Sequence, residues 1–229
     1  MVKYANEKRR KINELFFKNK KGDYGEGDKF LGVSGLEVQK LAKEFENLSL
    51  ADLETSLKSE YNEKRLLVIK ILIKKCRRRS LDDRKREEIF NFLWKNLDYI
   101  NNWNLVDLYA PNILGEFLYR KPKMKRILFK LSNSKSLWQR RIAIVSTKTF
   151  VKYGDLSLTL DILERHLNDQ EDLIHKALGW ILREVWKKDS LLCEEFLRKN
   201  YEKIPRTSLR YAIEKMDEEK RKAFLLGKF

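Results

Sequence analysis

A tryptophan and a carboxylate lie four residues apart in the run Asn101-Asn-Trp-Asn-Leu-Val-Asp-Leu-Tyr-Ala-Pro111. On a helix this spacing places Trp103 and Asp107 on one face. A carboxylate and the electron-rich face of an aromatic ring both attract positive charge. The pair is therefore a candidate site for stabilising a cation that develops during a reaction.

The helix that carries this pair is predicted to be amphipathic. At about 100° per residue, Asp107 lies at the edge of an apolar stripe. The stripe consists of Trp103, Val106, Ala110, Leu114 and Phe117. An acid at that edge is partly desolvated, and the commoner role of such an Asp is a buried ion pair with an Arg from a neighbouring helix.

Two later segments pair a tryptophan with an arginine at helical spacing. Trp138 precedes Arg141 by three residues, with Arg140 beside it, and Trp180 precedes Arg183 by three. Such pairs are suited to holding a sugar-phosphate backbone while presenting a ring to a sugar or base. We expect Trp138 in the core, whereas Trp180 fits a core position and a binding face equally well.

The overall charge favours a polyanionic partner. The chain has 50 Lys and Arg against 34 Asp and Glu, a net charge of +16. Such an excess attracts phosphates, so nucleic acid is the first partner to consider. The alternative is a basic but otherwise ordinary surface. A membrane surface is disfavoured because no apolar amphipathic terminus accompanies the charge.

The cysteines and histidines predict neither a disulfide framework nor a metal site. Cys76 and Cys193 lie far apart, and His166 and His175 lack partners at metal-ligand spacing. We expect both histidines on helix surfaces and no metal or cofactor. Without an apolar signal segment or a run of roughly 18 apolar residues, the expected location is the cytoplasm, in association with the nucleoid.

The predicted fold class is all-α, because no alternation of period two appears and only 9 Gly and 3 Pro interrupt the helices. Capping boxes are predicted at Ser34-x-x-Glu37, Ser49-x-x-Asp52 and Ser80-x-x-Asp83, with Pro122 in a first turn and Pro205 ahead of a helix. The predicted helices span 3–19, 35–47, 50–58, 61–78, 81–98, 103–120, 122–132, 136–153, 156–167, 170–187, 190–199, 207–216 and 218–226.

So many helices joined by short turns imply antiparallel neighbours. We predict a superhelical α-solenoid of HEAT-like helix pairs with a basic inner face, forming a single domain over 1–229 that acts as a monomer. A compact irregular bundle is the alternative. One segment, 20–33, carries four glycines and predicts a tight, specific excursion, with a plain helix connector as the alternative. It is not a phosphate-binding P-loop, because no Lys-Ser/Thr pair follows the glycines.

Several segments in this order resemble the DNA alkylation repair glycosylases of the AlkD-like, HEAT-like-repeat family. They are Gly22-Asp-Tyr-Gly-Glu-Gly-Asp-Lys-Phe-Leu-Gly-Val33, Asn102-Trp-Asn-Leu-Val-Asp107, Leu137-Trp-Gln-Arg-Arg-Ile-Ala-Ile144, Leu173-Ile-His-Lys-Ala-Leu-Gly-Trp-Ile-Leu-Arg-Glu184 and Pro205-Arg-Thr-Ser-Leu-Arg-Tyr-Ala-Ile213. The resemblance extends over nearly the whole chain.

The resemblance implies excision of positively charged alkylated purines, such as N3-methyladenine and N7-methylguanine, from duplex DNA in base excision repair. It implies that this hydrolase acts without drawing the base into a pocket and without a cofactor. The family's catalytic carboxylate falls on Asp107, its sugar-contacting tryptophans on Trp103 and Trp180, and its backbone-holding arginine on Arg141.

Further contacts with DNA are expected from the matched segments. The candidates are Arg140, Arg183, Tyr24, Lys29, Lys40 and Arg206. The chain departs from the family at Ser34-Gly-Leu-Glu-Val-Gln-Lys40, where relatives carry a Pro and then an Arg, and either Lys40 or Lys43 is a candidate to replace the missing charge. Lys cannot reproduce the bidentate geometry of Arg.

The residues also leave two non-enzymatic alternatives. One is a noncatalytic HEAT-like module that binds nucleic acid, and the other is a protein-interaction scaffold. The presence of Asp107 together with Trp103, Trp180 and Arg141 favours the enzyme over the module. The net charge of +16 favours either of these over the scaffold.

Overall fold

In the computed structural model, which describes residues 1–229, the chain is helical throughout. Its one β pairing is an isolated bridge between Lys29 and Tyr61. The helices divide into two compact units, Met1–Tyr109 and Ala110–Phe229. None of the helices combines the length and the apolar character needed to cross a membrane.

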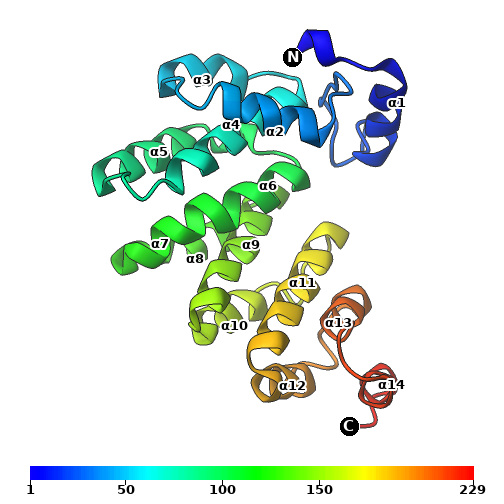
Figure 1. Ribbon diagram of the computed structural model, residues 1–229. Helices are drawn as coiled ribbons and strands as arrows, with labels where there is room; N and C mark the ends of the chain where they lie inside the picture. Colours follow the sequence, from blue (N-terminus) through cyan, green and yellow to red (C-terminus); the bar gives the residue numbers. More distant parts are fainter. The chain divides into compact units, whose positions relative to one another are not determined.

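The first unit is organised around one long helix, α4 (Figure 1). Its elements are η1 (Val2–Tyr4), α1 (Glu7–Phe16), α2 (Gly35–Glu44), α3 (Leu50–Leu57), α4 (Asn62–Cys76), α5 (Asp83–Lys95), η2 (Leu97–Tyr99) and α6 (Trp103–Tyr109). Helices α2, α3 and α6 all pack against α4. This is why α4 is buried on most of its circumference, with Val68, Ile69, Ile71 and Leu72 fully inaccessible.

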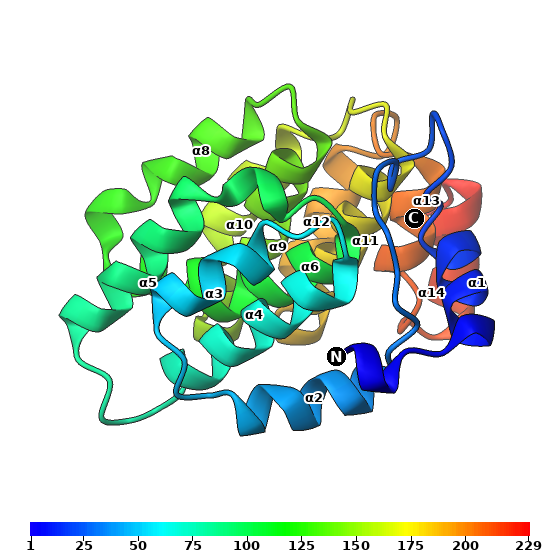
Figure 2. The same ribbon diagram turned by 90° about the horizontal axis from the view of Figure 1, so that it is seen from above.

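The second unit is built on two long helices, α9 and α11. Its elements are η3 (Ala110–Gly115), α7 (Glu116–Arg120), η4 (Pro122–Met124), α8 (Arg126–Ser132), α9 (Leu137–Tyr153), α10 (Leu156–Glu164), α11 (Asp172–Lys188), α12 (Ser190–Lys199), α13 (Arg206–Ala212) and α14 (Glu218–Leu226). Helices α8 and α10 pack on α9, and α12 and α13 pack on α11 (Figures 1 and 2). Gly179 permits a close approach of α11 and α13, since a Cβ there would lie 2.4 Å from the Ser208 carbonyl oxygen.

Pairs of neighbouring helices joined by short turns are the arrangement of the HEAT-like α-solenoid class, so the predicted fold class is confirmed. The single-domain organisation stays a prediction, because packing within each unit does not test it.

The capping predictions are confirmed at two of three sites. Ser34 with Glu37 and Ser49 with Asp52 form complete capping boxes. The box predicted at Ser80 is wrong. Asp82 caps α5 instead, its carboxylate accepting the backbone N–H of Lys85 at 2.7 Å. An Asp directly before the first helical residue caps as well as a Ser, and here it starts the helix two residues later than predicted.

The helix predicted over 103–120 forms, but a π-helical segment interrupts it. Helix α6 runs into η3 and then into α7 without a turn. Pro111 accounts for the change, because it has no N–H to donate to the carbonyl of Asp107 four residues earlier. A wider π turn accommodates this loss. The apolar stripe is still buried at Val106, Ala110 and Leu114.

The prediction that both histidines lie on helix surfaces is wrong for His166. Its side chain is buried, and its Nδ1 lies 3.6 Å from Asp169 Oδ2. His175 is half-buried, and its Nε2 lies 2.5 Å from the carbonyl oxygen of Asp169. Both rings therefore pack around the turn between α10 and α11, which periodicity alone did not reveal.

Because the His166 imidazole is buried, we expect the free energy of unfolding to depend on pH. Burial lowers the pKa of His166 below its ordinary value of 6.5, although the Asp169 carboxylate opposes that shift. The unfolded chain then binds more protons than the folded one just below pH 6.5, so stability falls as the pH drops through that range. We expect urea unfolding at pH 7.5 and 5.5 to show this loss, and His166→Gln to reduce it. An unchanged loss in the variant would assign the effect to other groups.

Candidate functional site

The glycine-rich segment 20–33 is braced against α4 and the start of α6. Asp28 is buried and ion-paired with the guanidinium of Arg65, which is also buried. Its Oδ2 accepts hydrogen bonds from the side-chain amides of Asn62 at 2.9 Å and Asn102 at 2.8 Å. A buried carboxylate with this many donors is fully compensated.

A second buried acid fixes the end of the same segment. The Glu63 carboxylate accepts the backbone N–H of Leu31 at 3.0 Å and of Gly32 at 2.9 Å. Gly32 has a φ of +75°, and a Cβ there would lie 2.1 Å from the Asn6 carbonyl oxygen, so this position requires glycine. These contacts favour the predicted specific excursion over a plain connector.

Trp103 lies at the edge of an aromatic cluster in the first unit. Its ring stacks on Phe17, with centroids 5.1 Å apart and planes at 23°, and meets the edge of Phe16 at 5.5 Å. Phe17 in turn stacks on Phe30, which belongs to the braced segment. Trp103 is half-buried, so part of its ring is free to contact another molecule while the cluster holds the rest.

Asp107 follows one turn later on the same short helix. Its side chain is half-buried. The buried Leu105, Val106 and Tyr109 hold the other face of α6 in the core. As predicted, the carboxylate is at the boundary between core and solvent, where charge interactions are stronger than in bulk water.

In the second unit, Arg141 and Trp180 lie on the packed pair α9 and α11. The buried Arg141 guanidinium donates to the Leu173 carbonyl oxygen. Trp180 is half-buried, and the ammonium nitrogen of Lys148 lies 4.7 Å from the centroid of its ring. This ring face of Trp180 is thus occupied by a cation of the chain itself. Trp138, expected in the core, is half-buried.

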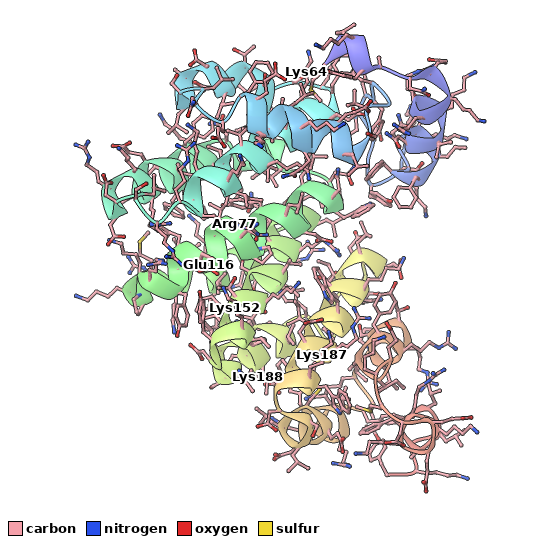
Figure 3. All side chains as sticks on the ribbon, viewed as in Figure 1. Lys64, Arg77, Glu116, Lys152, Lys187 and Lys188 are labelled. Atoms are coloured by element: carbon pink, nitrogen blue, oxygen red, sulfur yellow. The ribbon has the colours of Figure 1, made fainter.

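A groove of about 380 Å³ lies in the second unit, and one of its lining residues is Lys148, which contacts the Trp180 ring. Its polar lining includes Asn112, Glu116, Lys148, Thr149, Lys152, Glu184, Lys187 and Lys188. Lys152 is paired with Glu116 at 2.9 Å, and Lys187 with Glu184 at 2.8 Å. Figure 3 labels Glu116, Lys152, Lys187 and Lys188. No sequence motif marks these lysines, and the one available signal is that Lys148 and Lys152 share a helix face at a spacing of four.

The flanking arginines are held by carboxylates. Arg140 makes two bonds to Asp169, from Nε at 2.7 Å and from Nη2 at 3.2 Å. It also donates to the carbonyl oxygens of Ser134 and Lys135. Arg183 is ion-paired with Glu214. Contacts of Arg140 and Arg183 with DNA stay predictions, and for Arg140 they would have to replace several internal bonds.

The other predicted DNA-binding residues lie at or near the surface. The Tyr24 hydroxyl donates to the Phe16 carbonyl oxygen at 3.3 Å, and Lys29 is paired with Glu60 at 2.9 Å. Lys40 is exposed on α2. Arg206 is exposed and donates to the Leu225 carbonyl oxygen at 3.1 Å. No group of three His, Cys, Asp or Glu side chains is arranged to hold a metal ion.

Comparisons with known proteins identify the family of the chain. The family model described as DNA alkylation repair enzyme matches residues 1–216. A solved structure described as a predicted DNA alkylation repair enzyme from Enterococcus faecalis superposes with a TM-score of 0.73. The alignment covers 93% of this chain and 97% of that one at 16% identity, so it supports the fold. No curated protein matches. Because the family model matches nearly the whole chain, this protein belongs to the DNA alkylation repair enzyme family.

Proposed function

We propose that this protein is a DNA glycosylase that hydrolyses the N-glycosidic bond of positively charged alkylated purines in duplex DNA, without extruding the base. The observation that carries the proposal is the placement of Trp103 and Asp107. Both are half-buried and lie one turn apart on a helix that a buried polar network braces. Family membership supports the repair context.

The proposed chemistry takes place at the sugar. An N-alkylated purine carries a positive charge and already leaves readily, so it needs no general acid. As the bond from C1′ to the base breaks, C1′ acquires oxocarbenium character. The Asp107 carboxylate would stabilise that charge more in the transition state than in the ground state, and would orient the attacking water.

The electron-rich ring of Trp103 would attract the same developing cation. Trp180, in the second unit, would offer its ring to a cation only after the Lys148 ammonium, now 4.7 Å from the ring centroid, has moved away. Trp103 would offer the face left open by the Phe16 and Phe17 contacts. Arg141 would contact the DNA backbone, since a guanidinium can bind a phosphate in two places at once, but its buried side chain would first have to leave the Leu173 carbonyl oxygen.

The lysine-lined groove predicts a contribution to DNA affinity. Lys148 is a candidate phosphate contact, because it lines the groove and contacts the Trp180 ring. We expect Lys148→Gln to reduce the slope of log affinity against log salt by about 1, as for the loss of one phosphate contact. Fluorescence titration of a labelled duplex at several salt concentrations measures the slope. Lys222→Gln on α14 is the control, and equal slopes in both variants would remove Lys148 from the interface.

The experiment that tests the proposed function is release of methylated purine bases from methylated duplex DNA, with unmethylated duplex as control. Release from the methylated duplex alone is expected. Salt-sensitive binding of DNA without any release would instead indicate the noncatalytic nucleic-acid-binding module.

A further inference from the structure

Asp28, the buried acid of the glycine-rich segment 20–33, is linked by hydrogen bonds to the start of α6. We infer that Asp28, acting through Asn102, is a positioning residue for α6 and therefore for Trp103 and Asp107. The expected effect on catalysis rests on the proposed function. The expected effect on the position of α6 rests only on contacts within the first unit.

The Asp28 carboxylate joins three segments that are distant in the sequence. Oδ1 accepts from Arg65, and Oδ2 accepts from Asn62 at 2.9 Å and from Asn102 at 2.8 Å. The Asp28 and Arg65 side chains are 1% and 4% exposed, and Asn62 and Asn102 are as deeply buried. Because water is excluded, each of these bonds has a defined geometry that solvent cannot replace.

Asn102 transmits this geometry to the helix. Its Nδ2 donates to Asp28, while its Oδ1 accepts the backbone N–H of Trp103 at 2.8 Å. The Asn102 side-chain amide therefore links the Asp28 carboxylate to the first backbone N–H of α6. A second link lies two residues on, where the Asn104 amide donates to Asn62 Oδ1 at 2.8 Å.

The start of a helix needs such external contacts. Helix α6 begins the helical run at Trp103, and the first N–H groups of a helix have no acceptor within the helix itself. Its start is consequently set by the capping amide and the Asp28 network. Because a displacement of about 1 Å in a reacting group can cost about a hundredfold in rate, fixing this start matters for Asp107.

The test uses Asn102→Ala, which removes the link but leaves the Asp28–Arg65 pair intact. We expect its single-turnover excision rate to fall by about ten- to a hundredfold, with duplex affinity within about twofold of wild type. Asn96→Ala is the matched control. Asn96 is also a buried asparagine of the first unit, and its amide donates to the Phe92 carbonyl oxygen at 2.9 Å, away from α6. Its excision rate should stay near that of the wild type.

Amide hydrogen exchange separates this inference from the proposed function. In Asn102→Ala, the amides from Leu105 to Tyr109 should exchange faster than in the wild type, and in Asn96→Ala they should not. If wild-type protein releases no base, the proposed function fails while this exchange result still tests the positioning.

Equal losses of rate and equal exchange in Asn102→Ala and Asn96→Ala would overturn the inference. Asn102→Ser supplies a second variant if Asn102→Ala does not fold. Its hydroxyl can still cap the helix, but it is too short to keep the amide contact with Asp28. A rate and an exchange pattern like those of the wild type in this variant would likewise contradict a role for the Asp28 link.

Discussion

Asp107→Asn is expected to lower the rate of base excision at least about a hundredfold while leaving duplex affinity nearly unchanged. The amide has almost the shape of the carboxylate, so the half-buried position on α6 can accommodate it. What it lacks is the negative charge, which would act on C1′ only as the glycosidic bond breaks. The effect should therefore appear in the single-turnover rate constant, measured with a duplex that carries one N7-methylguanine.

Asp98→Asn is the matched control for that experiment. Asp98 is an exposed acid of η2 in the same unit, and it should be dispensable for excision. Equal rates for wild type and Asp107→Asn would remove Asp107 from the mechanism. A rate lost together with duplex affinity would assign Asp107 to binding instead.

Arg65→Leu is expected to lower the free energy of unfolding by about 3–5 kcal/mol. The substitution leaves the buried Asp28 carboxylate with its two amide donors but without its counter-ion. Breaking a buried ion pair from one side is costly, because the remaining charge stays out of water. A loss of this size is a large part of the total stability of an ordinary domain. Urea unfolding followed by circular dichroism measures it.

The control for the ion pair is Arg84→Leu. Arg84 lies 3.6 Å from Glu88, but its side chain is 83% exposed, and exposed pairs contribute little. Its unfolding midpoint should stay close to that of the wild type. If Arg65→Leu were as stable as Arg84→Leu, the Asp28 network would not be a structural anchor.

The helices could be predicted from the sequence because their signals are local. Apolar periodicity, the caps at Ser34 and Ser49 and the scarcity of Gly and Pro each act within a few residues. The π segment was missed, although Pro111 inside a predicted helix was a visible signal of irregularity. His166 was placed on a surface because helical periodicity does not show which turns other helices cover.

Candidate site residues could be proposed from the sequence, whereas the contacts that support them could not be predicted. The pairing of Trp103 with Asp107 is a matter of spacing on one helix. The Asp28 network joins positions 28, 62, 65 and 102, and no local pattern specifies contacts over such separations. The cluster of four glycines was the available signal, since glycine is needed where backbone must approach closely, as at Gly32. The contact of Lys148 with Trp180 likewise depends on how α9 packs against α11.

The most direct test of the central claim is the identity of the products formed from methylated duplex DNA. Mass spectrometry of the released material and of the DNA strand distinguishes hydrolysis from any other repair of the methyl group. A glycosylase must yield free methylated purine and an abasic site in equal amounts, and this is the result we predict. An intact strand that carries an unmethylated purine, or a duplex that is bound and left unchanged, would contradict the proposed activity.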